Sequence, residues 1–344
     1  MSDSLEGEAL VARLAELERA ARPLDPGTGR RRKLRNAVVA SAERFLRALE
    51  HSRAFVEDEA GGADLLGSPI GEKGLPIEDV VDLIEREVIT PGLNAASGGH
   101  LAYVPGGGIY HSSLGDYLAA ISNKYAGVFF TGPGPVRMEN LLIRWMADLV
   151  GYPAGASGNI ASGGSIASLV AITTARDARG LRGADYPKAA VYLTSQAHHC
   201  LTKALRIAGL AEAPVRIVPT DERYRMRVDA LEAMIAEDRS RGLIPWLVIA
   251  SAGTTDTGAV DPLEAIGAIS RREGCWFHVD AAYGGFFLLT EHGRRVFAGI
   301  ERSDSIVLDP HKGLFLPYGT GAVLIRDPAP LLAAHHYTAT YMQD

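Results

Sequence analysis

The sequence has few of the features that mark several large classes of protein. Only two cysteines, Cys200 and Cys275, occur in 344 residues, and neither has a partner at the short spacing of a metal or redox motif. We therefore expect two free thiols in a reducing compartment. No apolar run reaches the roughly 18 residues that a membrane-spanning helix needs. The N-terminal segment Ser2–Glu6 lacks the positive charge and apolar core of a signal peptide. We expect a cytoplasmic protein without membrane contact.

The chain also has no excess of basic charge. Lysine and arginine number 35 against 41 acidic residues, which gives a formal net charge of -6. A nucleic-acid partner would require a basic face, so we expect none. The one basic cluster, Arg30–Lys33 with Arg35, opens an amphipathic helix and is interpreted as a solvated helix face. Neither GxGxxG nor GxxxxGK[ST] occurs, which argues against a nicotinamide or nucleoside triphosphate site.

The composition, with 47% apolar and 22% charged residues, is that of a globular protein. A chain of this length indicates a large domain with a smaller element. Apolar residues at helical spacing predict helices over 5–20, 30–50 and 77–88. Amphipathic helices of this kind need a partner surface. We expect residues 1–90 to form an N-terminal helical segment at a dimer interface, and residues 91–344 to form a large α/β domain.

Short apolar strands alternate with helices from about residue 157 onward. This alternation predicts a mostly parallel sheet covered by helices on both faces, with ligands bound beyond the carboxyl ends of the strands. The expected strands are 190–193, 215–218, 247–251, 276–279, 305–308 and 322–325. The expected helices between them are 199–208, 228–240 and 262–273.

Two loops precede this α/β region. Glycines between Gly98 and Gly108 surround Tyr103, which indicates either a close backbone approach to another group or a flexible surface loop. Phe129 to Pro135 is interpreted as a second, apolar loop. The buried stripe of the helix that follows is predicted to consist of Met138, Leu141, Leu142, Trp145, Met146 and Leu149.

The prediction of function starts from the turn that contains Lys312. The apolar run Ser305–Leu308 is stopped by Asp309 and Pro310, which places His311 and Lys312 at the rim of the sheet. A partly desolvated amine is more easily neutral, and a neutral amine is a nucleophile toward carbonyl groups. Taken alone, the same pattern also fits a solvated lysine on a surface turn.

Polar residues also follow two other predicted strands and open one predicted helix. The turn Ser162–Ser165 opens a helix, where free backbone N–H groups and the helix dipole favour an anion, although such a turn also serves as a plain cap. Thr254 and Thr255 follow the strand 247–251. His198 and His199 follow the strand 190–193, and because adjacent helical residues point about 100° apart, we do not expect them to share a metal.

Asp280 ends the predicted strand that starts at Trp276, and its side chain lies on the same face as His278. A carboxylate at the end of a buried strand needs a cation. A metal hydrolase with ligands His278, Asp280 and His311 would lack a fourth ligand and would leave Lys312 without a role. A pyridoxal phosphate enzyme would need all of these groups: a lysine for the aldehyde, an aspartate for the pyridine nitrogen, an anion-binding turn for the phosphate and a ring over the cofactor.

These motifs, in this order, resemble the pyridoxal-phosphate-dependent group II decarboxylases, the family of aromatic-L-amino-acid decarboxylase. The resemblance extends over residues 75–344 and implies the fold-type I architecture of pyridoxal phosphate enzymes. The segments that carry it are Ser162–Ser165, Gln196–His198, Gly253–Thr255, His278–Gly285 and Asp309–Lys312.

The resemblance implies a role for each matching residue. Lys312 would bind the cofactor covalently, Asp280 would pair with its pyridine nitrogen, and His198 would stack on the ring and assist substrate binding or protonation. The remaining cofactor-binding residues would be Gly163, Gly164, Ser165 and His311 at the phosphate and Thr255 and Ala282 near the ring. The substrate side would be formed by Tyr103, Pro105 and Phe129, the last inserted from a neighbouring subunit.

The implied reaction is decarboxylation of an L-amino acid, expected to be aromatic, to the amine and CO2. The implied assembly is a homodimer with the site at the subunit interface, without a metal. The family's small C-terminal domain is expected to be absent from this chain. The alternatives are another reaction of the same fold, such as an aminotransferase or a carbon–carbon lyase, and a cofactor-binding protein without catalysis.

Overall fold

The structure is a computed structural model that describes residues 2–58, 61–68, 70–71, 74–101, 103–104 and 106–337. The chain forms two compact units, Met1–Leu101 and Ala102–Asp344. Among the described residues, we find no helix that is both long enough and apolar enough to cross a membrane.

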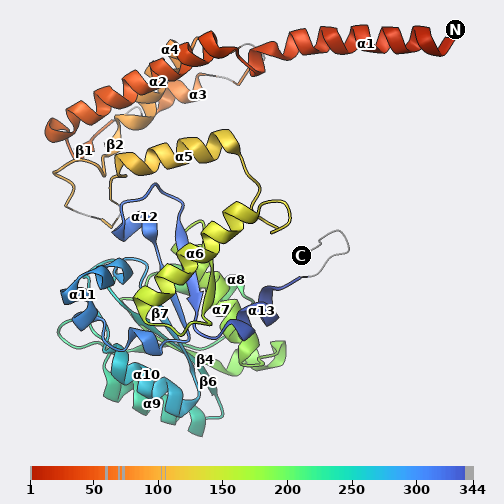
Figure 1. Cartoon of the computed structure of the whole chain (residues 1–344). Helices are drawn as coiled ribbons and strands as arrows, with labels where there is room; N and C mark the ends of the chain where they lie inside the picture. Colours follow the sequence, from red (N-terminus) through yellow and green to blue (C-terminus); the bar gives the residue numbers. More distant parts are fainter. Residues whose placement is uncertain are drawn as a thin grey trace. The chain divides into compact units, whose positions relative to one another are not determined.

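The first unit is built mainly from helices, as the spacing of its apolar residues predicted. Neither α1 nor α2 is described with a buried residue, and Leu10 and Leu14 of α1 are more than half exposed. A short antiparallel pair, β1 with β2, accompanies the helices. The elements of this unit (Figure 1) are α1 (Ser2–Ala21), α2 (Thr28–Ala48), β1 (Phe55–Val56), α3 (Ala63–Leu66), α4 (Ile77–Ile84) with its π-helical extension Glu85–Ile89, and β2 (Gly92–Leu93).

The second unit is organised around a seven-stranded sheet with the order β3-β9-β8-β7-β6-β4-β5. The strands β8, β7, β6, β4 and β5 are parallel, whereas β9 runs antiparallel to both of its neighbours. The sheet is therefore mostly parallel, as predicted. Its strands are β3 (Ser157–Ala161), β4 (Ala189–Thr194), β5 (Val215–Val218), β6 (Ile244–Ser251), β7 (Trp276–Asp280), β8 (Ser305–Leu308) and β9 (Gly321–Ile325).

Helices cover both faces of this sheet, and each face has its own hydrophobic core. One core joins the sheet to α6 (Pro133–Val150), α9 (Val228–Ser240) and α10 (Leu263–Glu273). The other joins it to α7 (Gly164–Ala178), α8 (Cys200–Ile207) and α13 (Pro328–His335). Strands buried on both faces read as nearly continuous apolar runs, which is why β4, β6 and β8 were recognisable in the sequence.

Several elements of this unit were not predicted, among them the strand β3 and the helix α5 (Tyr110–Ser122). The strand β3 has the sequence Ser-Gly-Asn-Ile-Ala, and its pairing with β9 at the edge of the sheet does not require a continuous apolar run. The helix α5 follows the glycine-rich loop and contains Gly115, and none of its residues is buried. Neither segment has the regular spacing of apolar residues from which helices and strands were predicted.

The prediction for α6 was wrong in two respects. The helix begins at Pro133, inside the predicted apolar loop, because proline fits the first turn of a helix, where its missing N–H is not needed. Its buried face is made by Ile143, Met146, Ala147 and Val150, so only one residue of the predicted stripe is buried. Met138 and Leu141 are about two-thirds exposed, at 65% and 67%. The helix therefore carries a second apolar face that is exposed among the described residues.

Candidate active site

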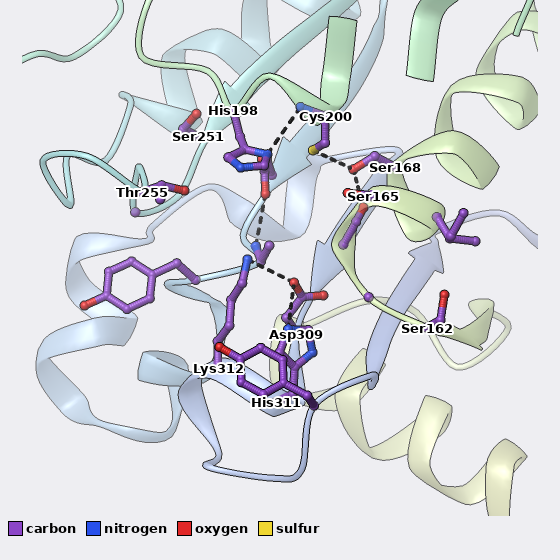
Figure 2. A pocket seen from close by; sticks show the side chains of 18 of the residues that line it. Ser162, Ser165, Ser168, His198, Cys200, Ser251, Thr255, Asp309, His311 and Lys312 are labelled. Atoms are coloured by element: carbon purple, nitrogen blue, oxygen red, sulfur yellow. Dashed lines mark hydrogen bonds and ion pairs between the residues drawn. The ribbon is translucent and has the colours of Figure 1, made fainter. Parts of the chain in front are cut away.

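The carboxyl ends of the parallel strands surround a cavity of about 340 Å³. Its walls come from the turn before α7, the turns after β4, β6 and β7, and the segment after β8. Figure 2 shows His198 and Lys312 entering it from different sides, with Asp309 beside Lys312. The structure brings together nine residues that were predicted from the sequence: Gly163, Gly164, Ser165, His198, Thr255, Asp280, Ala282, His311 and Lys312.

One wall of the cavity is the turn that opens α7. Gly163 adopts φ 141°, a backbone conformation that favours glycine, and Gly164 is the first helical residue. The first N–H groups of a helix have no intrahelical acceptor, and in the described chain no other group accepts from Gly164 or Ser165. The turn therefore offers backbone donors to an anion in the cavity.

Lys312 lies at the opposite side, on the short helix α12 (Pro310–Gly313) that follows β8. Its Nζ is 3.0 Å from Oδ2 of Asp309, and its side chain is 21% exposed. His311 is buried beside it; its Nδ1 donates to the carbonyl oxygen of Thr320, which orients the ring. Nε2 of His311 lies 3.9 Å from the same Asp309 oxygen. The amine is thus enclosed and held by one carboxylate.

Asp280 ends β7 and reaches the same cavity. Its Oδ1 accepts a hydrogen bond of 3.1 Å from the backbone N–H of Ala282, and this bond fixes the carboxylate at the strand end. The neighbouring strand β6 ends at Ser251, which pairs in register with Asp280 and also lines the cavity. The carboxylate is therefore available to a cationic group inside the cavity.

His198 stands on the turn between β4 and α8. The backbone N–H of Cys200 donates to its Nδ1 at 3.3 Å, so the proton of the neutral ring lies on Nε2. Burial lowers the pKa of His198, and the adjacent His199 lowers it further, while Asp280 acts in the opposite direction. The ring therefore enters the cavity as a neutral imidazole near pH 7.

The metal-site alternative finds no support in the described part of the chain. No group of three or more His, Cys, Asp or Glu side chains there could hold a metal ion. His278 is buried and does not line the cavity, and its Nδ1 lies 2.8 Å from Oγ of Ser305. Trp276 donates to the same hydroxyl. Burial lowers the pKa of His278 to about 4, so it is a neutral core residue.

Two of the three residues expected on the substrate side, Tyr103 and Phe129, do not line the cavity. Tyr103 is 80% exposed with φ 69° and does not line the cavity. Phe129 also lies outside the cavity wall, and the guanidinium of Arg137 stands over its ring at 5.3 Å. Pro105 falls outside the described residues. Their expected roles remain predictions.

Several residues line the cavity that were given no role from the sequence, among them two tyrosines and Asp309. Tyr283 and Tyr318 contribute aromatic rings, and the ring of Tyr318 lies 5.2 Å from that of His311. Asp309 was interpreted only as the residue that stops β8, although it is 1% exposed and contacts the lysine. The signal for Asp309 was present, because an acidic residue next to a buried strand end needs a cation.

The cavity fits pyridoxal phosphate on several independent observations. The donors at the start of α7 suit a phosphate, the enclosed amine of Lys312 suits an aldehyde, and Asp280 suits a protonated ring nitrogen. The carboxylate of Asp309 also has one oxygen, Oδ1, without a partner among the described residues. A ligand that brings a hydrogen-bonding group to this wall would satisfy it.

Comparisons with known proteins agree with this fit. The aromatic-L-amino-acid decarboxylase of Bacillus atrophaeus is 35% identical over 300 residues, which cover 86% of this chain and 62% of that protein. The mouse cysteine sulfinic acid decarboxylase is 37% identical over 240 residues, covering 67% of this chain and 48% of that protein. The L-2,4-diaminobutyrate decarboxylase of Rhizobium meliloti is 39% identical over 216 residues, covering 62% and 43%. The chain thus spans about half the length of these relatives.

Solved structures show the same fold. The crystal structure of Oryza sativa TDC with PLP and tryptamine superposes with a TM-score of 0.85 at 27% identity, over 92% of this chain and 68% of that chain. Mouse CSAD superposes with a TM-score of 0.82 at 29% identity, over 93% and 68%. The model of the pyridoxal-dependent decarboxylase conserved domain matches residues 65–344. The chain therefore belongs to the pyridoxal-dependent decarboxylase family.

Proposed function

We propose that the protein decarboxylates an L-amino acid to the amine and CO2, using pyridoxal phosphate. One observation supports the proposal most strongly. Lys312, Asp280 and the donor turn at Gly163–Ser165 all line one cavity at the carboxyl ends of the parallel strands. When bound, pyridoxal phosphate supplies an electron sink for the electrons that CO2 leaves behind.

Five residues of the cavity are proposed to interact with the cofactor or the substrate. Lys312 would supply the amine that holds the cofactor. Asp280 would pair with the ring nitrogen and keep a proton on it. The N–H groups of Gly164 and Ser165 fix the phosphate end. His198, neutral with its proton on Nε2, can donate from that atom to a substrate oxygen over the ring.

We propose that the substrate is aromatic. Among the described residues, no arginine lines the cavity, so no guanidinium there could bind a second acidic group. Tyr283 and Tyr318 instead provide aromatic surface at the cavity wall. The relative from Bacillus atrophaeus, which is named as acting on aromatic amino acids, matches 86% of this chain, against 67% for the mouse cysteine sulfinic acid decarboxylase.

We also propose that the protein works in the cytoplasm as a homodimer with the site at the subunit interface. The exposed apolar face of α6, which includes Met138 and Leu141, supports the dimer, because a large apolar face in water favours association. The exposed apolar residues Leu10 and Leu14 of α1 support a place for the N-terminal helical segment, residues 1–90, in the same interface. The two cysteines are unpaired, in keeping with a reducing compartment.

The proposal is tested by measuring both products. The purified protein is saturated with pyridoxal phosphate and given tryptophan, tyrosine, phenylalanine, cysteine sulfinate and 2,4-diaminobutyrate separately. We expect CO2 and the matching amine in equal amounts from an aromatic substrate. Release of CO2 only from cysteine sulfinate or diaminobutyrate would overturn the aromatic assignment. Formation of a keto acid without CO2 from every substrate would favour an aminotransferase instead.

A further inference from the structure

Asp309 is the most enclosed ionisable group of the cavity, and the proposed reaction gives it no task. It is 1% exposed, and its Oδ2 lies 3.0 Å from Nζ of Lys312. Its Oδ1 is buried without a hydrogen-bond partner among the described residues. A buried carboxylate with an unpaired oxygen is costly, and it becomes more costly when its cation is removed.

The carboxylate lies directly against the anion-binding turn. A Cβ atom built on Gly164 would be 2.8 Å from Oδ2 of Asp309, and one on Gly321 would be 2.6 Å from Oδ1. Only glycines leave room for the carboxylate between α7 and β9. A phosphate held by the first N–H groups of α7 would therefore be a close neighbour of Asp309. Two anions in contact cannot both stay charged without a cation between them.

The charged and titratable groups near Asp309 come from two segments of the chain. Lys312 and His311 follow it on α12, at 3.0 and 3.9 Å from Oδ2. His198 and Cys200, on and after the turn that follows β4, feel its charge at longer range, and burial keeps both neutral near pH 7. Burial raises the pKa of the Cys200 thiol to about 11. In the described structure Lys312 is thus the nearest cationic amine.

Cofactor binding changes this arrangement. The nitrogen of Lys312 forms a bond to the aldehyde carbon, the aldehyde oxygen leaves as water with two of the ammonium protons, and one proton stays on nitrogen. This step neither takes up nor releases a proton. The nitrogen would then be bonded to the cofactor and keep a single proton, and the phosphate, on another ring carbon, would lie beside Asp309. The carboxylate would thus face a phosphate where it now faces a free ammonium.

We propose that Asp309 takes up one proton when pyridoxal phosphate binds and donates it in a hydrogen bond to the phosphate. The proton removes the repulsion between the two anions and gives the carboxyl a partner. The inference rests on the cofactor site and not on decarboxylation, so it can fail or hold whatever reaction the protein catalyses.

Proton uptake can be measured without catalysis. The full-length apoprotein is titrated calorimetrically with pyridoxal phosphate near pH 8, in two buffers of different ionisation enthalpy. We expect uptake of about one proton per site, so that the dissociation constant rises about tenfold per pH unit. The Asp309→Asn variant should bind the cofactor with no uptake and a flat pH dependence. The control Asp256→Asn, at an exposed position, should behave as the wild type.

Two further probes keep the test decisive if Asp309→Asn does not fold. Pyridoxal carries the aldehyde but no phosphate, so its binding to the wild type should take up no proton. Phosphorus-31 spectra of the bound cofactor should show the phosphate dianion, because the proton lies on the carboxyl. Uptake with pyridoxal, a monoanionic phosphate, or unchanged uptake in Asp309→Asn would each overturn the proposal.

Discussion

The backbone N–H of Cys200 donates a hydrogen bond of 3.3 Å to Nδ1 of His198, which fixes the neutral ring with its proton on Nε2. Because Cys200 begins α8, the tautomer of His198 is set by the start of a helix and not by a second side chain. The direction in which this histidine can donate is therefore part of the fold.

His198 should act as a donor from Nε2. Substitution by alanine is expected to lower kcat by about 100-fold to 10,000-fold, the usual contribution of a positioned acid or base. His198→Gln, whose amide nitrogen can donate from a similar place, should retain more activity than His198→Ala. Equal losses in the two variants would show that the donor is not needed. Because burial lowers the pKa of His198, its nuclear magnetic resonance titration should lie below pH 6.5.

Gly164 should tolerate no side chain. A Cβ atom there would meet Oδ2 of Asp309 at 2.8 Å and Cβ of Ala282 at 3.4 Å. We expect Gly164→Ala to cost roughly 1–3 kcal/mol through local displacement, which lowers the affinity for pyridoxal phosphate by about tenfold to a hundredfold. The control is Gly134→Ala in the first turn of α6, where a Cβ meets nothing within 4 Å. Equal cofactor affinities in the two variants would contradict the close contact.

Asp280 should matter for rate more than for binding. A change of two units in the pKa of the ring nitrogen corresponds to about 2.7 kcal/mol, so Asp280→Asn is expected to lower kcat by about a hundredfold or more. The cofactor should still bind, because the donor turn and Lys312 are untouched. Near-normal turnover in a cofactor-saturated Asp280→Asn protein would contradict the proposal that this carboxylate pairs with the ring nitrogen.

His278 should make the fold less stable in acid. Burial lowers its pKa from the ordinary 6.5 to about 4. Between these two pH values the unfolded chain binds a proton that the folded chain does not, so the free energy of unfolding falls as the pH falls, by up to about 3 kcal/mol in all. The measurement is denaturant unfolding at several pH values. His278→Gln should flatten this part of the curve, whereas the exposed control His51→Gln should not.

The sequence was sufficient for six of the seven strands because the central strands of the sheet are buried on both faces. The apolar runs 215–218 and 305–308 coincide with β5 and β8, and the other predicted strands differ from the observed ones by at most three residues at an end. The mostly parallel order follows from alternation with helices. The antiparallel direction of β9 has no such signal, since a strand pattern is the same in both directions.

Burial that depends on packing could not be predicted. The apolar residues of α6 are distributed around the helix, and spacing alone does not tell which face meets the sheet. Met138 and Leu141 were therefore assigned to the core although they lie on the exposed face. The same limit applies to the cavity: Tyr318 comes close to His311 only through the turn that follows α12, which no local pattern specifies.

The chemistry of the site was more predictable than its packing. Residues at strand ends meet in space when the strands are parallel, so Asp280 and Lys312 could be placed together from sequence positions alone. Asp309 was given no chemical role because it was considered only as the residue that stops the strand 305–308. Its contact with Gly164 joins two segments far apart in the chain, and only the structure shows it.

The covalent link at Lys312 is the central claim and can be tested directly. The protein is loaded with pyridoxal phosphate, reduced with borohydride, which makes a lysine–aldehyde linkage permanent, and digested for peptide mass spectrometry. The account predicts the phosphopyridoxyl mass on the peptide that contains Lys312, its loss in Lys312→Ala, and its retention in the control Lys203→Ala. A label on Lys203 or another lysine, or a label that survives in Lys312→Ala, would contradict it.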